Sequence, residues 1–566
     1  MEEPRTFRLL DERIAARGQA VHAHVKRDAA WQPVSWHELR LAYLRTAGRL
    51  RALHPARRPV VAILSESSFE WSVCDLATMA LGGVVAGIYA NDRDEVVRHI
   101  LECSKPSIVA VQHAAMLERL QRIAPAWGTE LPVIMMQGAA AANEHVHALA
   151  DWIAAPLDGE LTAAVLAEIQ RVSPDDVAGH IYTSGTSGLP KAAILTQGHL
   201  LHTAQVYARY YPVDATDSTL LFLPLAHVFS RVMYYAALLW GARLYYARST
   251  DEVTGDLVVV HPTILLVVPR MLERVRNAVL SAMRGSGALT RAVFRWSTAL
   301  GRRYFLDGKR DVLTRIGVAV ARRLVLDRMR DRFGGRLRFL GCGGGKLPVE
   351  VAVFFRQFGL ELYEGYATTE SGGLGVFNHP GAWRLGRVGK PVPELEVRLA
   401  DDGEVWLRGG SVFAGYLDDP AATRQALNDG WLATGDIGRF DPDGFLEIVD
   451  RKKDIIATAN GKKVAPAWIE SRLTTQPEIA EAVVVGEGRP YLVSLIVAAV
   501  PDAAASEQIA RAVEVANDSL ARHERIRRFR VVPEFTLGTG AVTATLKLRR
   551  EAICSIYRDE IERMYE

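Results

Sequence analysis

One short run of residues concentrates hydroxyl groups, glycines and a lysine at a spacing that suits phosphate binding. It reads YTSGTSGLPKAA over 182–193 and follows an apolar run. Glycine allows close backbone approach, amides and hydroxyls donate hydrogen bonds, and Lys191 supplies positive charge. Gly185, Gly188 and Lys191 fall at three-residue intervals, whereas a P-loop needs G-x-x-x-x-G-K-[ST]. The run therefore predicts a phosphate-binding loop and disfavours a kinase or a GTPase; an ordinary flexible Gly/Ser loop is the alternative.

Six further runs follow that loop along the chain. They are LFLPLAHVF (221–229), YEGYATTE (363–370), WLATGDIG (431–438), DRKKDII (450–456), GKKVAP (461–466) and TATLKLRR (543–550). Together with the first run they resemble, in order, the motifs of the adenylate-forming (acyl-AMP) ligase superfamily. LFLPLAHVF is similar to the version found in long-chain fatty acyl-CoA synthetases. The resemblance spans most of the chain, from about 180 to 550.

The resemblance implies a two-step reaction. A carboxylate is a poor electrophile, so such enzymes join it to the α-phosphate of ATP and expel magnesium pyrophosphate, and a thiol then attacks the acyl-adenylate. Both steps develop negative charge that preorganised donors and cations stabilise. The implied cofactors are therefore ATP, Mg²⁺ and coenzyme A, the last as a substrate.

The same resemblance assigns roles around the triphosphate. It implies that Glu370 helps to hold Mg²⁺ and that Thr369 binds the α-phosphate, because a hard cation prefers oxygen ligands shared with phosphates. The family usually has glycine where Ala367 stands, and a methyl group there costs little unless the site needs positive φ. The residues implied to cradle the β- and γ-phosphates are Thr183, Ser184, Gly185, Thr186, Ser187 and Gly188, with Lys191 nearby.

The adenosine half of ATP is assigned in the same way. The run GCGGGKLP over 341–348 resembles the segment that lines the adenine, with Tyr366 stacking on the other side; a tight strand-to-helix turn is the alternative. Asp436 resembles the carboxylate that accepts the ribose hydroxyls, and Arg451 its basic partner. The full set implied to bind the nucleoside is Gly343, Gly344, Gly345, Glu364, Tyr366, Asp436 and Arg451.

Three residues carry the remaining implied roles. Lys547 resembles the lysine that reaches the carboxylate and the α-phosphate during adenylation, a task suited to a compact, mobile charge. Lys453 falls at the hinge position about which a small domain swivels. The resemblance also implies that His227 lines the acyl-adenylate site, with no proton-transfer role. Without the resemblance, a histidine after an apolar run indicates a hydrogen-bonded core residue. Two alternatives stay open for Trp240, Tyr234 and Tyr235. These side chains either form the wall of a tunnel for the acyl chain or belong to the hydrophobic core.

Elements of a layered α/β fold would position these residues. Short β-branched runs at 60–64, 107–111 and 263–268 each precede a segment of helical periodicity, which indicates a mostly parallel sheet. From 386 to 450, short strands separated by Asp-Gly turns predict a β-rich subdomain. We therefore expect a large N-terminal domain of layered α/β subdomains over 1–450. A small, mobile α+β lid domain is expected over 451–566.

Composition excludes several classes of protein. The chain has 566 residues, 49% hydrophobic and 23% charged, which is typical of a folded enzyme. Its net charge of +3 implies no general polyanion-binding field, so no nucleic-acid partner is expected. Four scattered cysteines show no metal-ligand spacing and fit a reducing compartment. The N-terminal residues lack a signal-like apolar core, and no apolar stretch reaches membrane-spanning length. A cytoplasmic protein is expected.

A basic segment over 302–338 adds a partner hypothesis. It holds twelve Lys and Arg residues against four Asp, and part of it alternates apolar and basic residues at helical spacing. Such a helix either lies on an anionic membrane surface or packs, solvated, on the main body. Peripheral membrane contact would suit a substrate that partitions into lipid.

These observations predict an ATP-dependent ligase that joins a long-chain fatty acid to coenzyme A. Two alternatives within the enzyme class are acyl transfer to a carrier-protein phosphopantetheine and activation of another hydrophobic acid. A third is a non-catalytic acyl-AMP or nucleotide-binding relative, against which Thr369, Glu370, Asp436 and Lys547 argue.

Overall fold

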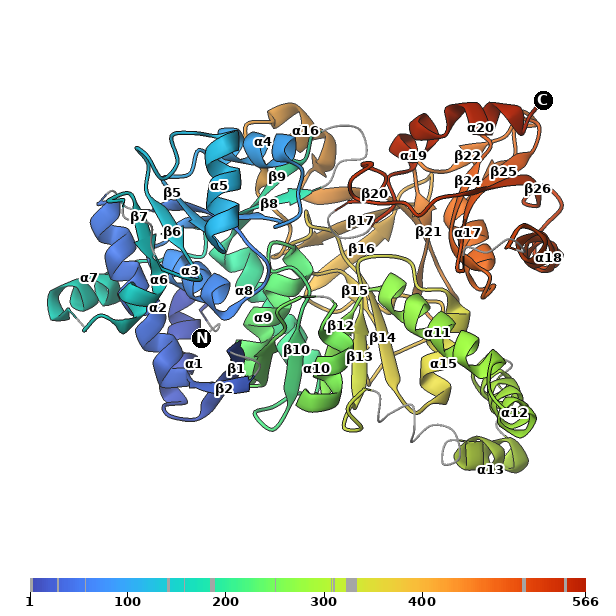
Figure 1. Cartoon of the computed structure of the whole chain (residues 1–566), viewed down its shortest axis with the longest axis horizontal. Helices are drawn as coiled ribbons and strands as arrows, with labels where there is room; N and C mark the ends of the chain where they lie inside the picture. The colour runs from blue at the N-terminus through green and yellow to red at the C-terminus, as the bar shows by residue number, and fades with distance from the viewer. Residues whose placement is uncertain are drawn as a thin grey trace.

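The computed structural model describes residues 4–27, 30–55, 58–139, 143–156, 158–183, 189–249, 251–306, 308, 311–321, 333–500, 505–543 and 547–566. Strands and helices alternate through the first two thirds of the chain, and a smaller domain follows (Figure 1). This arrangement confirms the predicted α/β class with a large and a small domain. The boundaries at 386 and 450 stay predictions.

A first sheet contains the strand that leads into the phosphate-binding run. Its core strands are parallel, and β9 and β18 extend it in antiparallel fashion. Helices α3 and α5 follow β3 and β5, as the sequence predicts. The strands, in spatial order, are β18 (Gly415–Tyr416), β9 (Lys191–Thr196), β8 (Val177–Thr183), β4 (Val84–Ile88), β3 (Val60–Leu64), β5 (Ile108–Val111), β6 (Val133–Met135) and β7 (Val146–Ala148).

A second sheet carries the predicted adenine and magnesium residues at the ends of its strands. Its strands are parallel from β14 to β1, with antiparallel β15 and β2 at the two edges. The strands, in spatial order, are β15 (Val376–Phe377), β14 (Glu361–Tyr366), β13 (Phe339–Cys342), β12 (Ile264–Val267), β10 (Ser218–Leu221), β11 (Arg243–Tyr246), β1 (Val21–Arg27) and β2 (Ala30–Ser35).

Helices cover both faces of these sheets. One continuous apolar core joins the facing sides of the two sheets through α2, α3, α8 and α9. Separate clusters bury the outer face of each sheet under α4 and α5, or under α10, α11 and α15. The helices of the large domain are α1 (Phe7–Ala16), α2 (Trp36–Leu53), α3 (Phe69–Ala80), α4 (Asp94–Ser104), α5 (Ala114–Ile123), α6 (Leu149–Ala154), α7 (Gly159–Ile169), α8 (Gln197–Tyr210), α9 (Val228–Trp240), α10 (Val253–Val260), α11 (Pro269–Arg284), α12 (Ala288–Phe305), α13 (Val312–Ala321) and α15 (Val349–Gln357).

An antiparallel sheet follows, in the region where the sequence predicts short strands. Gly403, Gly430 and Gly444 each follow an aspartate in a turn and adopt positive φ, which glycine tolerates without strain. The elements are β16 (Leu395–Leu399), β17 (Glu404–Gly409), α16 (Pro420–Ala426), β19 (Leu427–Asn428), β20 (Trp431–Phe440) and β21 (Leu446–Arg451).

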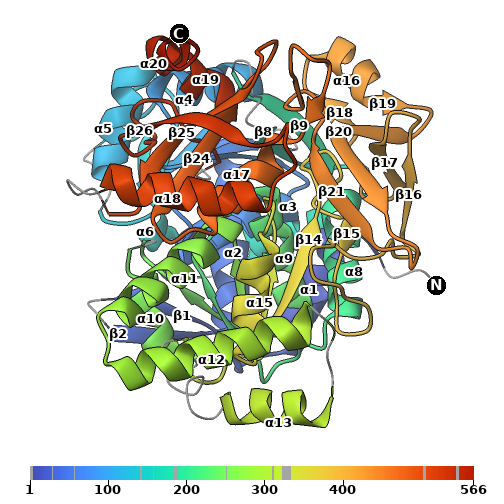
Figure 2. The same ribbon diagram turned by 90° about the vertical axis from the view of Figure 1, so that its right-hand side faces the viewer.

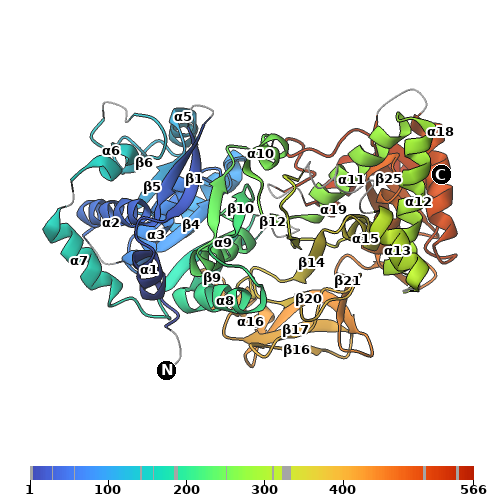
Figure 3. The ribbon, with the colours of Figure 1, turned by 90° about the horizontal axis from the view of Figure 1, so that it is seen from below.

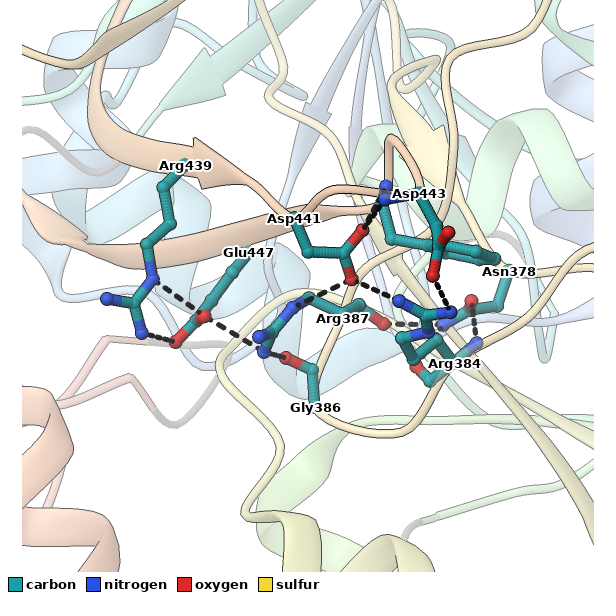
Figure 4. Close-up of polar contacts among 9 residues, drawn as sticks. Asn378, Arg384, Gly386, Arg387, Arg439, Asp441, Asp443 and Glu447 are labelled. Atoms are coloured by element: carbon teal, nitrogen blue, oxygen red, sulfur yellow. Dashed lines mark hydrogen bonds and ion pairs between the residues drawn. The ribbon is translucent and has the colours of Figure 1, made fainter. Parts of the chain in front are cut away.

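A charged network fixes this antiparallel sheet to the second sheet (Figure 4). Arg384, in the loop after β15, donates to Asp441 over 2.7 Å and to Asp443 over 2.6 Å. Arg387 pairs with Glu447 over 2.9 Å, and the Asn378 amide donates to the Arg387 carbonyl over 2.6 Å. The network holds the β20–β21 hairpin, which carries the predicted ribose residues, against the sheet that carries the predicted magnesium residue.

The small domain packs beside α11 and α15 (Figures 2 and 3). The Arg276 guanidinium donates to the Thr475 carbonyl over 3.2 Å, and Arg472 pairs with Glu350. The domain consists of β22 (Ile456–Ala457), β23 (Lys463–Val464), α17 (Pro466–Thr474), β24 (Ile479–Val485), β25 (Leu492–Ala498), α18 (Ala505–Asp518), β26 (Ile526–Val532), α19 (Arg550–Ile556) and α20 (Arg558–Arg563).

Within the described ranges, no helix combines the length and the apolar character that a membrane span requires.

Candidate active site

A cavity of about 860 Å³ lies where the second sheet, the antiparallel sheet and the small domain meet. It is large enough for a nucleotide together with a second substrate. Predicted site residues from widely separated segments line it, so the fold brings the sequence motifs together. These lining residues are Thr183, Lys191, His227, Gly343, Gly344, Thr369, Glu370, Arg451, Lys453 and Lys547.

The end of β14 places the predicted magnesium residue. After Tyr366 the chain turns, and Glu370 reaches the cavity, where its Oε1 accepts a 2.7 Å hydrogen bond from the Tyr416 hydroxyl. Among the described residues, the non-glycine positions with positive φ are Arg58, Lys105, His261, Asp418 and Asp429. Ala367 is not one of them, so alanine in place of the family's glycine costs no backbone strain here.

The predicted ribose residues form a connected group just beneath the cavity wall. Asp436 and Arg451 face each other in the β20–β21 register, and their side chains pair over 3.1 Å. The Tyr366 hydroxyl donates to the other Asp436 oxygen over 2.7 Å. Burial raises the pKa of Asp436, and Arg451 and Tyr366 oppose that rise. The arrangement holds the Asp436 carboxylate in a fixed orientation; of these three residues, Arg451 lines the cavity, whereas Tyr366 and Asp436 are not among its lining residues in the described part of the chain.

Lys547 enters the cavity from the small domain. Its backbone exchanges hydrogen bonds with Thr543, whose N–H donates to the Lys547 carbonyl over 2.8 Å. Lys547 as a whole residue is exposed, yet burial of its ammonium by the surrounding protein atoms lowers its pKa. Arg451 lowers the pKa further, whereas Asp436 and Glu370 raise it. The lysine therefore shares one electrostatic environment with the predicted ribose and magnesium residues.

His227 is the N-cap residue of α9 and lines the same cavity. Its Nδ1 accepts a 3.2 Å hydrogen bond from the Phe229 N–H, so the ring caps the helix. Burial, and then the charge of Lys547, lower the pKa of His227 to about 3. The imidazole is therefore neutral at physiological pH.

The strands on either side of the phosphate-binding run also meet the cavity. Thr183 at the end of β8 pairs in register with Lys191 at the start of β9. The Lys191 ammonium lies 3.0 Å from an Asp419 carboxylate oxygen and 5.5 Å from the centre of the Tyr416 ring. The predicted phosphate-binding residues Ser184, Gly185, Thr186, Ser187 and Gly188 lie outside the described residues.

The glycines after β13 form the opposite wall. Gly344 has a φ of +86°, a conformation that favours glycine. Gly345 and Glu364 are not among the residues that line the cavity in the described part of the chain. The Glu364 carboxylate points into the core instead and accepts the Leu347 N–H over 3.3 Å. Burial raises the pKa of Glu364 to about 8, so it is largely protonated at pH 7.

A tunnel-like part of this cavity runs along one face of the second sheet. Alternate strand residues face the same side, and the register puts them in rows. The first row is formed by Gly343 and Gly365. The next row is Leu266, Gly341 and Tyr363, and the last row is Thr219, Ile264 and Phe339.

Two helices form the other side of this tunnel. Tyr207 at one face of α8 is followed one turn later by Tyr211, just after the helix ends. Met233, Ala237 and Trp240 share one face of α9. The tunnel is therefore apolar and aromatic over its length.

Comparison with known proteins identifies the family. A model of the AMP-binding enzyme family matches residues 11–417, and a model of the AMP-binding enzyme C-terminal domain matches residues 453–566. The chain belongs to the AMP-binding enzyme family. Membership confirms the resemblance carried by the motifs and makes the chain an adenylate-forming acyl-CoA ligase that uses ATP with Mg²⁺ and takes coenzyme A as a substrate.

Several AMP-binding relatives span almost the whole chain. The long-chain-fatty-acid–CoA ligase FadD15 of Mycobacterium bovis is 34% identical, over 95% of this chain and 93% of its own length. The human long-chain-fatty-acid–CoA ligase 1 is 28% identical, over 89% of this chain and 78% of its own. The anthranilate CoA ligase AuaEII, solved with anthranoyl-AMP, superposes with a TM-score of 0.76 at 20% identity and 98% coverage of both chains.

The AMP-binding site has a donor set that fits magnesium. Among the described residues, no cluster of three or more His, Cys, Asp or Glu side chains could cage a metal ion. Mg²⁺ is usually held by one or two carboxylates together with substrate phosphates. Glu370 supplies such a carboxylate beside the hydroxyl of Thr369, and a bound Mg²⁺ would neutralise charge on the departing phosphates.

The structure adds contacts that the motifs did not indicate. Tyr416, which orients Glu370, lies in β18, a two-residue strand outside every motif. The sequence motifs also did not indicate that residues of α8 and β13 line the tunnel. Of the tunnel residues, Trp240 had been considered as a possible wall of an acyl tunnel. Tyr234 and Tyr235 are fully buried beside it and do not line the cavity. The i, i+4 spacing of Tyr207 and Tyr211 was the one available signal, and it is shared by any core-facing helix.

Proposed function

We propose that this enzyme activates long-chain fatty acids as acyl-adenylates and transfers the acyl group to coenzyme A. The observation that carries the proposal is the apolar tunnel, which begins at the nucleotide cavity and ends at the row of Thr219, Ile264 and Phe339. An acid whose carboxylate lies near Lys547 would extend its chain between the second sheet and α9. The names of the FadD15 and human relatives support the same acid class.

The length of the tunnel gives a quantitative expectation. Gly343 and Phe339 are four residues apart along one strand direction, which corresponds to ~13 Å. With C–C bonds of ~1.5 Å at an angle of ~111°, that is the length of about ten carbons of an extended chain. Each buried methylene contributes about 0.8 kcal/mol, or roughly fourfold. We expect kcat/KM to rise by up to about fourfold per added methylene over at least this length, so that long-chain acids are better substrates than short ones.

The roles of individual residues belong to the same proposal. Lys547 would stabilise charge on the carboxylate and the α-phosphate, and Thr369 and Glu370 would bind the α-phosphate and Mg²⁺. Tyr366, Asp436 and Arg451 would hold the adenosine. The glycines Gly343 and Gly344 let the base lie close to the backbone, and the residues 183–188 with Lys191 would receive the outer phosphates.

A pyrophosphate-release screen with saturated acids of graded length tests the proposal. A Thr219→Phe variant fills the last row, so we expect it to lose activity about tenfold or more with the longest acids. Activity with short acids should stay unchanged, which controls for misfolding. Thr219→Ala, which removes side-chain volume at the same position, should retain its activity with the long acids. A flat response to chain length in the unmodified enzyme would refute the acid class.

The thiol acceptor needs its own measurement. Acyl-adenylate formation is followed with palmitate and ATP, and either free coenzyme A or a loaded carrier protein is then added. Product with coenzyme A supports the proposal. Product only with the carrier would replace coenzyme A as the acceptor, and absence of pyrophosphate release with every acid would favour a non-catalytic nucleotide-binding relative. We further propose that the enzyme works in the cytoplasm at a membrane surface.

A further inference from the structure

We propose that the hairpin of α12 and α13 docks the enzyme on an anionic lipid bilayer, with one apolar face of α13 entering the membrane interface. The two helices lie at the edge of the large domain, and α13 lies outside α12 in both side views (Figures 1 and 2). This surface is separate from the cavity, to which neither helix contributes a residue among those described.

One face of α13 accounts for its packing on the protein. Thr314, Val318 and Ala321 are buried. Gly317 lies so close to α12 that a Cβ there would stand 2.9 Å from the Leu300 side chain. The helix is therefore firmly seated through this face, and its opposite face is turned away from the large domain.

The opposite face of α13 is apolar and uncovered. Val312, Leu313, Ile316 and Val320 are 70%, 81%, 55% and 44% exposed. Their spacing puts them on one side of a helix. Single exposed apolar residues are ordinary, but a contiguous set on one face marks an interaction surface. On α12, Trp296 is 43% exposed and adds an aromatic ring of the type enriched at membrane interfaces.

Charge identifies the partner as anionic. Residues 288–321 contain seven Lys and Arg against two Asp, an excess of five, whereas the whole chain has a net charge of only +3. Every arginine that the structure describes in this hairpin is exposed. These residues are Arg291, Arg295, Arg302, Arg303 and Arg315. A basic residue near an anionic bilayer strengthens binding by about fivefold.

The same charge argues against a second copy of the chain as the occupant. A two-fold interface brings the same patch of both subunits together. Here it would bring two sets of these arginines face to face, and like charges repel across an interface. An exposed apolar helix face in a segment with an excess of basic residues is instead the pattern of helices that lie in a bilayer surface.

Vesicle co-sedimentation of the full chain tests the proposal. We expect binding to phosphatidylcholine vesicles that contain phosphatidylglycerol, and binding at least tenfold weaker to phosphatidylcholine alone or at high salt. Leu313→Asp/Ile316→Asp should lose tenfold or more of the binding, because both side chains are exposed and the packed face is untouched. The matched control is Val258→Asp/Val259→Asp on α10, where the residues are 47% and 64% exposed; it should bind normally.

Further measurements distinguish the alternatives. Both variants should release pyrophosphate from a short, soluble acid as fast as the unmodified enzyme, which excludes misfolding. Equal loss of vesicle binding in both variants, or no binding to anionic vesicles at all, would overturn the proposal. So would a dimer in light scattering that only the α13 variant dissociates. Vesicle binding needs neither acid nor nucleotide, so its failure is distinct from failure of the chain-length screen.

Discussion

The Arg231 guanidinium and the Asp75 carboxylate form an ion pair of 2.5 Å in the middle of the large domain, with side chains 2% and 0% exposed. Arg231 also donates to the Ala178 carbonyl of β8 over 3.2 Å, and the Tyr235 hydroxyl donates to the other Asp75 oxygen over 2.7 Å. The pair connects α3, α9 and β8. It thereby fixes the strand before the phosphate-binding run relative to the helix that begins at His227.

Removing one partner of this pair should be costly. Arg231→Met leaves the Asp75 charge buried without compensation, and breaking such a pair costs about 3–5 kcal/mol of the free energy of unfolding. The double variant Asp75→Asn/Arg231→Met removes both charges and keeps an acceptor for Tyr235, so it should recover most of that loss. Urea unfolding of the three proteins measures the difference. Equal destabilisation in the single and double variants would contradict the role of charge.

Lys547→Ala should separate the two half-reactions. Lys547 lines the cavity with Glu370 and is attracted electrostatically by Asp436, so its ammonium can stabilise charge that develops during adenylation. Loss of one such preorganised group lowers kcat by roughly 10²–10³-fold. Pyrophosphate release should fall by this factor, while thioester formation from supplied acyl-AMP stays near normal. Lys463→Ala, an exposed lysine of the same domain, is the control. Equal loss of both steps would show that the role is misassigned.

Tyr416→Phe should weaken the use of magnesium. The hydroxyl orients Glu370 through a 2.7 Å hydrogen bond, and loss of such an orienting partner typically costs 10–100-fold in metal affinity. The Mg²⁺ concentration for half-maximal pyrophosphate release should rise by about tenfold or more. Tyr210→Phe removes a hydroxyl that contacts Glu394 outside the cavity and should leave the Mg²⁺ response unchanged. An unaltered response in Tyr416→Phe would separate this tyrosine from metal binding.

Lys453→Pro tests the hinge. Lys453 lines the cavity just after β21, where the chain leaves the antiparallel sheet for the small domain. Proline fixes φ, so it should restrict a rotation at this point. We expect adenylation to change little and thioester formation to fall, because only the second step needs the other domain orientation. Single-turnover measurements of each step separate them, and normal overall turnover would count against rotation at this residue.

The buried Glu364 should make stability depend on pH. Burial raises the pKa of this carboxyl from 4.5 to about 8, and Lys346 nearby opposes the rise. Above about pH 4.5 the unfolded chain loses a proton that the folded chain keeps until about pH 8. The free energy of unfolding therefore falls as pH rises through this window. Glu364→Gln removes this contribution, so its stability relative to the unmodified protein should increase from pH 5 to 8. A constant difference would mean that Glu364 is ionised in the folded state.

Much of the cavity lining was predictable because its residues lie in short, contiguous motifs. Thr369 and Glu370 follow one strand, and Asp436 lies in TGD, so each local run carried its own chemistry. The alternation of β-branched runs with helical periodicity likewise indicated the parallel sheets. Glu364 shows the limit of this reasoning, because its motif suggested a nucleotide contact whereas its side chain faces Leu347 in the core.

The sequence by itself determined the family, the reaction class and the order of the α/β, β-rich and terminal segments, since these depend on local patterns. Only the tertiary structure decided which side chains share the cavity. Tyr416 meets Glu370 across 46 residues, and Arg231 meets Asp75 across 156. Such contacts depend on strand order, register and the direction of each side chain, and no local pattern of apolar or polar residues encodes them. The tunnel, the orientation of Glu370 and the exposed face of α13 all arise at this level.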